Sequence, residues 1–347
     1  AFIMLGTKIG FDLGTTTIAA NVDGKGIKIN EPSVIVYDCF EEKVKAIGKE
    51  AYKMLGKTPD YLTAIRPIID GDIYDYGALE QMLCYFIQKI CGNRILKPSI
   101  IACVPSETNE IDKKTVTDLL ISSGAARACV IEEPLAAALG AGVSIKNPEG
   151  VLIVDIGGGT TDIAVVTRGC IANSSSVGIA GNAFDEDICR FARRERDTVI
   201  GSITAEKVKK QVGAAKFLDA ELAVRAVGKD YITKLPKSIE LTSTDIFLCI
   251  REHLEKIVES IKLLLSGTQP ELVADIAKNG MIITGGGANI RGIDDYFRTK
   301  FGFNVKCAES PELCVANGLG ILLDDIKVLE ENGYVFRSYA DMNDFEE

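Results

Sequence analysis

One short pattern occurs twice in this chain: a strand ending on an aspartate, a turn rich in glycine and threonine, and a second strand. Residues 9–20 read IGFDLGTTTIAA and residues 153–165 read IVDIGGGTTDIAV. An alignment that makes the second turn two residues longer pairs Thr15 with Thr160 and Ile18 with Ile163. The repeat predicts a chain of two related halves, whose turns would form a phosphate clamp if they face each other.

The residue types of the two turns suit a phosphate ligand. Glycine allows sharp turns and a close backbone approach, successive N–H groups form an anion-binding concavity, and threonine hydroxyls add donors. The carboxylates of Asp12 and Asp155 repel phosphate, so a hydrated Mg²⁺ between them and the phosphate oxygens is expected. For one copy alone, a plain hairpin turn remains an equal alternative.

Composition restricts the class of protein. The 347 residues suffice for two ordinary domains, and a chain that is 47% hydrophobic and 25% charged is typical of soluble globular proteins. The formal net charge of −10 argues against nucleic-acid binding through phosphate neutralisation. Ten scattered cysteines and one histidine, His253, match neither a zinc site nor a disulfide framework, so we expect reduced thiols in the cytosol.

Strand-like runs alternate with helical periods, which predicts an α/β protein. A buried strand is expected at residues 98–105 and helices at 109–124, 182–196 and 244–266. No run reaches the roughly 18 apolar residues that span a bilayer. MIITGGG at residues 281–287 supplies a third glycine turn, and the acidic, aromatic tail is expected to be mobile with occasional docking.

In this order, the motifs resemble the superfamily of actin, sugar kinases and heat-shock chaperone ATPases, and within it the MreB family of bacterial actins. The resemblance covers about residues 7–328, and six motifs in one order are far more specific than any single glycine turn. They are NEPSV at 30–34, AIRP at 64–67 with Asp70-Gly71, IEEP at 131–134, DIGGGTT at 155–161, GIAG at 178–181 and TGGG at 284–287.

The resemblance implies an actin-like two-domain fold with ATP in the cleft, each domain having a mixed-sheet ribonuclease H-like core and a small subdomain. Domain I is expected at residues 1–145, with its small subdomain at about 34–65. Domain II is expected at 146–330, with its small subdomain at about 182–240, and residues 331–347 form the acidic tail.

The resemblance also assigns site residues. One turn would hold the ATP phosphates with Asp12, Gly14, Thr15, Thr16 and Thr17, and the other with Asp155, Gly157, Gly158, Gly159 and Thr160. Asp12 and Asp155 would hold Mg²⁺ through water, and Gly285, Gly286 and Gly287 would pass beside the adenosine. Glu206 and Lys209, spaced as Glu-x-x-Lys, are expected at the ribose or adenine, the alternative being an ordinary surface ion pair.

For hydrolysis, the family places a glutamate directly before the proline, which is Glu133 here. Such a carboxylate orients water for in-line attack on the γ-phosphorus. Glu132 is the alternative, and Thr160 is expected to help place the water.

MreB-like proteins polymerise on ATP binding into double filaments that lie on the inner membrane and organise cell-wall synthesis. The resemblance therefore implies three kinds of partner: the chain itself, inner-membrane lipids and membrane proteins of the cell-wall machinery. It also implies a cytoplasmic location at the membrane's inner face. Ile95 and Leu96 occupy the place of a membrane-inserting loop, the alternative being that they pack into their own domain.

Three other functions stay open. A divergent filament-forming paralogue would hydrolyse ATP weakly. A small-molecule kinase of the same superfamily would need an acceptor pocket with a catalytic aspartate, which the sequence does not reveal. A chaperone-like ATPase would need a substrate-binding domain, and none is recognised after residue 330.

Overall fold

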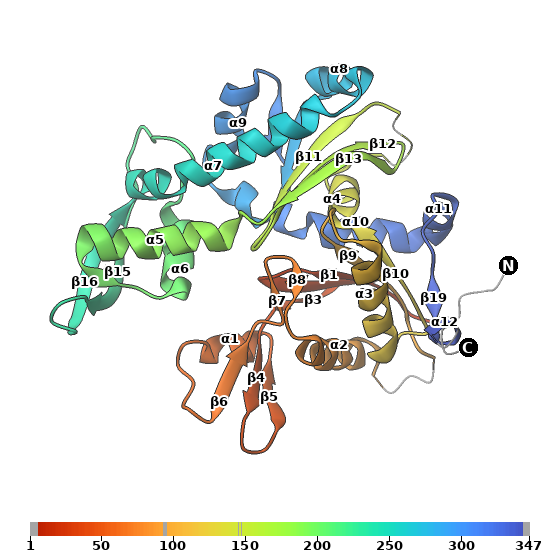
Figure 1. Cartoon of the computed structure of the whole chain (residues 1–347), viewed down its shortest axis with the longest axis horizontal. Coiled ribbons are helices and arrows are strands. Elements are labelled where there is room, and N and C mark those ends of the chain that lie inside the picture. The colour runs from red at the N-terminus through yellow and green to blue at the C-terminus, as the bar shows by residue number, and fades with distance from the viewer. Residues whose placement is uncertain (1–5, 93–95, 145, 147, 343–347) are drawn as a thin grey trace.

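The computed structural model describes residues 6–92, 96–144, 146 and 148–342, and it shows two lobes built on mixed β-sheets (Figure 1). In the first sheet, β1, β9 and β10 run parallel, while β2 and β3 continue from β1 as an antiparallel meander. In spatial order its strands are β19 (Arg337–Ser338), β10 (Arg127–Glu132), β9 (Ser99–Val104), β1 (Lys8–Leu13), β2 (Thr17–Val22) and β3 (Gly26–Pro32).

The second sheet repeats this plan. Its central strands β11, β17 and β18 are parallel, and β12 and β13 form the antiparallel meander after β11. Its spatial order is β13 (Cys170–Val177), β12 (Thr161–Thr167), β11 (Val151–Ile156), β17 (Met281–Thr284) and β18 (Val305–Cys307). The predicted α/β class with two mixed sheets is therefore confirmed.

Helices cover both sheets and separate them. Apolar side chains of α2 and α3 pack on the first sheet, and those of α5, α6, α7 and α9 pack on the second. The helices are α1 (Lys49–Met54), α2 (Tyr76–Cys91), α3 (Glu110–Ser122), α4 (Glu133–Gly140), α5 (Gly181–Arg196), α6 (Ser202–Val212), α7 (Ser243–Ser266), α8 (Pro270–Asn279), α9 (Ile293–Phe301), α10 (Cys314–Asp324), α11 (Ile326–Glu331) and α12 (Tyr339–Met342), with 3₁₀ helices at Gly286–Asn289 and Pro311–Leu313.

Local sequence explains where the predicted helices begin. The Asn109 side chain accepts hydrogen bonds from two backbone N–H groups at the start of α3, as expected of an N-cap residue. Thr242 and Asp245 form a reciprocal capping box at the start of α7. The expected helices at 109–124, 182–196 and 244–266 correspond to α3, α5 and α7 within two residues at each end.

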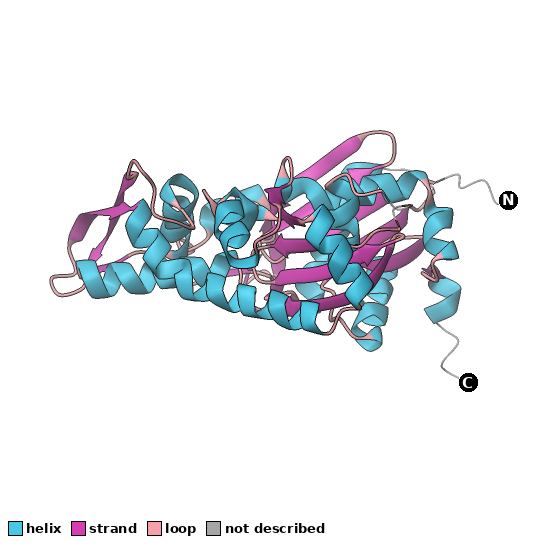
Figure 2. Ribbon diagram, turned by 90° about the horizontal axis from the view of Figure 1, so that it is seen from above, coloured by secondary structure: helices cyan, strands magenta, loops and turns pink. Residues whose placement is uncertain are grey.

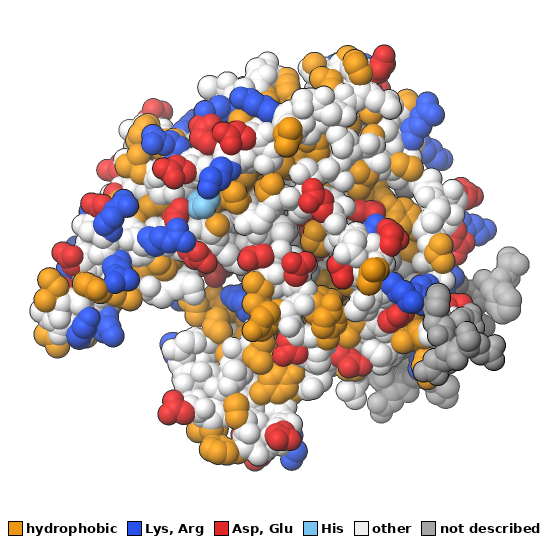
Figure 3. Space-filling view, in the orientation of Figure 1, with side chains coloured by type: hydrophobic (Ala, Val, Ile, Leu, Met, Phe, Trp, Pro, Cys, Tyr) orange, Lys and Arg blue, Asp and Glu red, His pale blue; other side chains and the backbone are white. Residues whose placement is uncertain are grey.

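Each lobe carries a small additional layer. In the first lobe, β5 (Lys43–Ile47), β4 (Ile35–Asp38) and β6 (Leu62–Ile65) form a sheet beside α1. In the second, β14 (Thr198–Val199), β15 (Ala223–Asp230) and β16 (Pro236–Thr242) form a sheet beside α5 and α6. The two layers project as separate arms with a notch between them (Figure 3), and the second arm lies far from both termini (Figure 2). They fall where the small subdomains were expected, and the exact domain boundaries stay predictions. A two-stranded ribbon of β7 (Ile68–Ile69) and β8 (Asp72–Ile73) follows the first layer.

Helices α4 and α10 lie between the two large sheets with their backbones in contact. A Cβ atom added to Gly140 would lie 1.8 Å from the Cys314 carbonyl oxygen, and one added to Gly318 would lie 1.8 Å from the Ala136 carbonyl oxygen. Only glycine permits helices to approach this closely. α10 also contacts β1 and β2 of the first sheet, so this helix pair links the two lobes.

The C-terminal segment, expected to be mobile with occasional docking, is docked in the structure. β19 pairs antiparallel with β10 through Arg127–Ser338 and Ala128–Arg337, and Tyr334 and Phe336 pack against the apolar cluster between the sheets. Aromatic side chains gain free energy by leaving water, so the segment docks as far as residue 342. The acidic residues beyond it lie outside the described part of the chain.

Of the expected membrane loop, Leu96 is 53% exposed, which differs from the alternative that it packs into its own domain. Ile95 lies outside the described residues. Within the described ranges, no helix is both long and apolar enough to cross a bilayer.

Candidate nucleotide site

The two glycine and threonine turns lie face to face. A Cβ atom added to Gly158 would lie 2.0 Å from Thr16 Oγ1, and one added to Gly159 would lie 2.7 Å from Thr15 Oγ1. Real side chains do not tolerate such separations, so glycine at these two positions is what allows the turns to meet. The structure thereby brings together two segments that lie about 140 residues apart in the sequence.

The two turns have the same length, which corrects the alignment made from sequence. The paired strand ends are Leu13 with Ile18 in one hairpin and Ile156 with Thr161 in the other, so residues 14–17 correspond to 157–160. Thr17, and not Thr15, is therefore the counterpart of Thr160. The sequence alignment matched two identical isoleucines, whereas hydrogen-bond register sets the true equivalence.

A cavity of about 510 Å³ opens between the turns and the lobes, a size typical of small-molecule sites. Every residue assigned above to the phosphates, the adenosine or the attacking water lines this cavity. The structure thus brings all of these predicted site residues together. These are Asp12, Gly14, Thr15, Thr16, Thr17, Glu133, Asp155, Gly157, Gly158, Gly159, Thr160, Glu206, Lys209, Gly285, Gly286 and Gly287.

Three carboxyl groups, those of Asp12, Asp155 and Glu133, line this cavity. Burial, reinforced by the nearby charge of Asp155, raises the pKa of Asp12 to about 7. Burial likewise raises the pKa of Asp155 to about 7, although Thr284 donates a 2.5 Å hydrogen bond to it. Burial, together with Asp162, Asp12 and Asp155, holds the pKa of Glu133 well above its usual range. Like charges this close disfavour one another, so the site favours a cation.

The residues fit a magnesium ion that binds mainly through phosphate and water. Asp12 and Asp155 line the cavity, and Mg²⁺ keeps several waters and takes one or two carboxylates. Among the described residues no group of three or more metal-ligating side chains occurs. The Thr16 hydroxyl is buried without a hydrogen-bond partner within the described part of the chain. Buried polar groups ordinarily have a hydrogen-bond partner, and a phosphate oxygen bound in the cavity would supply one for this hydroxyl.

The surface ion-pair alternative for Glu206 and Lys209 is wrong. Glu206 accepts hydrogen bonds from Tyr52 at 2.8 Å and from Lys210 at 2.6 Å. Lys209 instead pairs with Asp185 at 2.9 Å and donates to the Gly181 carbonyl oxygen at 2.5 Å. Both side chains are held at the cavity wall by other partners, which leaves their predicted contact with the nucleoside a prediction.

The three glycines after β17 serve different purposes. Cβ atoms added to Gly285 and Gly287 would lie 2.4 Å and 2.3 Å from atoms of Ile156, whereas one added to Gly286 would meet nothing within 4 Å. Gly285 and Gly287 therefore allow the turn to pack on the end of β11. Gly286 alone leaves open space.

Sequence reasoning missed several polar groups at the cleft. The Ser106 backbone N–H and hydroxyl donate to the buried Asp162 carboxylate at 2.8 Å and 3.0 Å, across the two lobes. Asp185 lines the cavity, and burial raises its pKa to about 6 despite Lys209. Asp162 is the second residue of β12, next to the second turn, and this position beside a repeated motif is the signal that could have pointed to it.

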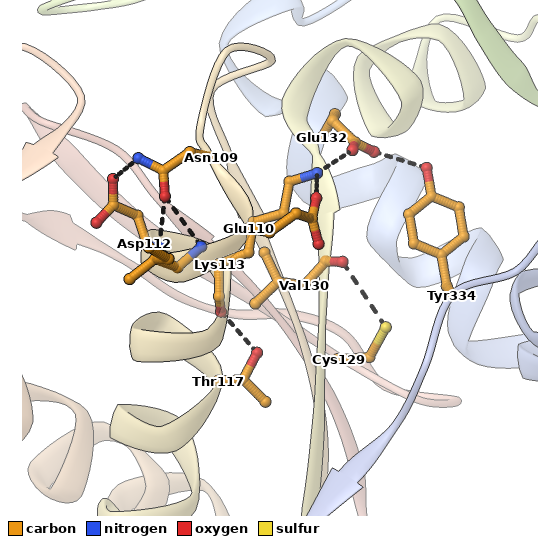
Figure 4. A network of polar contacts seen from close by, with 10 residues as sticks. Asn109, Glu110, Asp112, Lys113, Thr117, Cys129, Val130, Glu132 and Tyr334 are labelled. Atoms are coloured by element: carbon orange, nitrogen blue, oxygen red, sulfur yellow. Dashed lines mark hydrogen bonds and ion pairs between the residues drawn. The ribbon is translucent and has the colours of Figure 1, made fainter.

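The two neighbouring glutamates differ in surroundings. Glu133 lines the cavity, whereas the Glu132 carboxylate accepts hydrogen bonds from Lys113 and Tyr334 on the other side of the turn (Figure 4). This arrangement favours Glu133 over Glu132 as the residue that faces a bound phosphate.

The paired mixed sheets and the facing turns define an actin-like protein. MreB 5 of Spiroplasma citri, solved with AMPPNP and with ADP, superimposes with a TM-score of 0.90 at 37% sequence identity. The match covers 95% of this chain and 99% of that one.

The chain belongs to the MreB/Mbl family, whose model matches residues 6–331. The cell shape-determining protein Mbl of Bacillus subtilis (strain 168) is 42% identical over 330 residues, covering 94% of this chain and 98% of Mbl. The cell shape-determining protein MreB of Escherichia coli (strain K12) is 37% identical over 329 residues, covering 93% and 95%. The family predicted from the six motifs is confirmed.

Proposed function

We propose that this chain binds and hydrolyses ATP and polymerises into membrane-associated filaments that organise cell-wall synthesis and cell shape. The observation that carries the proposal is the single cavity in which Asp12, Asp155 and both glycine turns converge. The relative MreB 5 binds AMPPNP and ADP. The chain would act in the cytoplasm, at the inner face of the membrane, with membrane proteins of the cell-wall machinery as partners.

In this proposal the two turns hold the phosphates from opposite sides. Backbone N–H groups of residues 14–16, 158 and 159, with the Thr15 and Thr16 hydroxyls, would donate to phosphate oxygens, whereas the Gly157 N–H already donates to the Thr160 carbonyl oxygen. Asp12 and Asp155 would hold Mg²⁺ through water, and the ion would offset phosphate charge. Glu206, Lys209 and the open side of Gly286 would border the adenosine.

Hydrolysis would use Glu133 as the group that orients water. An oxygen of its carboxyl group would accept a hydrogen bond from the water, aligning it with the γ-phosphorus, while Thr160 fixes the opposite side. The water oxygen bonds to the γ-phosphorus as the bond from that phosphorus to the bridging oxygen breaks; ADP leaves with the bridging oxygen, and the proton of the water passes to an oxygen of the released phosphate. Little covalent help is needed because phosphoryl transfer depends mainly on positioning and charge stabilisation.

Glu133→Gln tests this assignment. We expect phosphate release to fall by about 100-fold while ATP still binds, and light scattering to rise with ATP but not with ADP in the unsubstituted protein. Glu259→Gln, on the exposed side of α7, is the control and should release phosphate normally. Unchanged phosphate release by Glu133→Gln would reject Glu133 as the water-orienting residue. Equal light scattering with ATP and with ADP would reject the coupling of filament assembly to ATP.

Membrane attachment would depend on Ile95 and Leu96. Two aliphatic side chains contribute roughly 3 kcal/mol on burial, and each of the neighbouring cations Arg94 and Lys97 about 1 kcal/mol near anionic lipid. One subunit would bind weakly, whereas a filament repeats the loop and gains avidity. Filaments should therefore sediment with anionic liposomes, and the double variant Ile95→Ser, Leu96→Ser should form filaments that stay in solution. Equal sedimentation of both proteins would defeat this part of the proposal.

A further inference from the structure

The C-terminal strap, residues 332–342, lies beyond the stretch that the MreB/Mbl model matches, which ends at residue 331. It is nevertheless attached to the body of the molecule. The Phe336 ring lies 4.4 Å below the Arg127 guanidinium, Arg337 approaches Asp118 at 3.6 Å, and β19 pairs with β10. The strap thus follows the edge of the strand that leads directly to Glu133.

One strap residue contacts the residue next to Glu133. The Tyr334 hydroxyl donates a 2.6 Å hydrogen bond to one oxygen of the Glu132 carboxylate, and Lys113 of α3 donates a 2.8 Å bond to the other oxygen (Figure 4). Both carboxylate oxygens are therefore held, from two directions, by elements outside the β10–α4 turn.

The charge state of Glu132 agrees with this geometry. Burial alone would raise the pKa of Glu132, but the bonds from Lys113 and Tyr334 outweigh it and lower the pKa. Glu132 therefore stays a carboxylate, the form that accepts both bonds most strongly.

The bonds from Tyr334 and Lys113 together set the direction of the Glu132 side chain. Glu132 is the N-cap residue of α4, yet its carboxylate makes no capping bond to the helix, where an acidic group is ordinarily stabilised. It turns instead toward the strap and α3. The following residue, Glu133, is buried and begins the helix, so the direction of its side chain depends on the backbone that Glu132 anchors.

We infer that Tyr334 is a positioning residue for ATP hydrolysis: by holding Glu132, it fixes the β10–α4 turn and so aims Glu133 into the cavity. The inference rests on the proposed hydrolytic role of Glu133. The chain's own C-terminal strap, a feature outside the family match, then sets the hydrolysis rate without touching the nucleotide.

Tyr334→Phe tests the inference because it removes only the hydroxyl. We expect phosphate release at saturating ATP to fall by about tenfold, as a small misplacement of a water-orienting group would cause. The dissociation constant of ATP, measured without turnover by displacement of a fluorescent analogue, should stay unchanged. Tyr339→Phe makes the same chemical change in the strap at a side chain that is 65% exposed, and it should release phosphate normally.

Three results would overturn the inference: unchanged release by Tyr334→Phe, an equal loss in Tyr339→Phe, or a parallel weakening of ATP binding. The first two would show that the hydroxyl does not act on Glu133, and the third would show general loosening of the site. The result for Glu133→Gln separates the two claims. If that variant loses hydrolysis while Tyr334→Phe does not, the strap inference alone fails; if neither loses it, the role of Glu133 fails first.

Discussion

At the scale of single residues, the cleft is dominated by carboxyl groups that burial keeps from ionising freely. Asp12, Asp155 and Glu133 end or begin elements that converge between the lobes, so their mutual repulsion is built into the fold. Such a cluster costs the protein stability when its groups are charged. A bound cation would relieve that cost, which links occupancy of the site to stability.

This cost predicts a pH dependence for the protein without nucleotide or magnesium. Burial raises the pKa of Asp12 and of Asp155 from 3.8 to about 7, so the folded state binds these protons more tightly than the unfolded chain does. Their stabilising effect is complete below about pH 4 and is lost as the pH rises through about 7, with an upper limit of about 4 kcal/mol for one such shift.

Urea unfolding between about pH 5 and pH 8 should therefore show a falling free energy of unfolding. Asp12→Asn should flatten the slope and make the protein more stable at pH 8 than the unsubstituted chain, while weakening its affinity for magnesium and ATP. An identical pH slope in both proteins would contradict the prediction.

Among the structural elements, the two glycine and threonine turns pack directly against each other. The threonine side chains of the first turn occupy the space that the missing side chains of Gly158 and Gly159 leave open. Gly158 admits the Thr16 hydroxyl. A methyl group there would displace Thr16 and its free donor.

Gly158→Ala should therefore weaken ATP binding by about tenfold, close to the loss of one hydrogen bond to a charged group. Gly178→Ala is the matched control, since a Cβ atom there would meet nothing within 4 Å. Both affinities are measured by isothermal titration with magnesium and AMPPNP. Equal affinities of the two variants for AMPPNP would show that nucleotide binding does not depend on the close contact between the two turns.

Local sequence predicted the helices α3, α5 and α7 and the turn residues of the cavity lining, because turn chemistry and helix periodicity are short-range properties. It did not predict lining residues such as Asn182, Asp185 and Glu312. It misjudged features set by distant partners. The equal length of the turns depends on strand register, and the docking of Tyr334 and Phe336 depends on an apolar cluster between the sheets. Tyr52, which binds Glu206, and Asp185, which binds Lys209, likewise come from segments that no spacing rule connects.

At the scale of the whole molecule, two hydrogen-bonded contacts join the lobes across the cleft. Tyr52 of α1 donates to Glu206 of α6, and Ser106 donates to Asp162 at the start of β12. These partners lie 154 and 56 positions apart in the sequence. The first contact joins the two small layers and therefore favours a closed cleft.

Tyr52→Phe should open the cleft more often. A hydrogen bond to a charged group is worth about 1.5 kcal/mol at the low end, so release of a fluorescent ADP analogue should become about tenfold faster. Tyr61→Phe, a 44% exposed tyrosine of the same small layer, should release it at the normal rate. Stopped-flow traces that coincide for all three proteins would exclude Tyr52 as a link between the layers.

The backbone contact between α4 and α10 limits how the lobes can move. Two helices that touch through Gly140 and Gly318 cannot approach more closely, so a change in the angle between the lobes would be a rotation about this helix pair. Glu133 stands at the first turn of one of the pivot helices. Such a rotation would change the direction of the Glu133 carboxyl group. The proposed cleavage of ATP would then occur only at one angle between the two lobes.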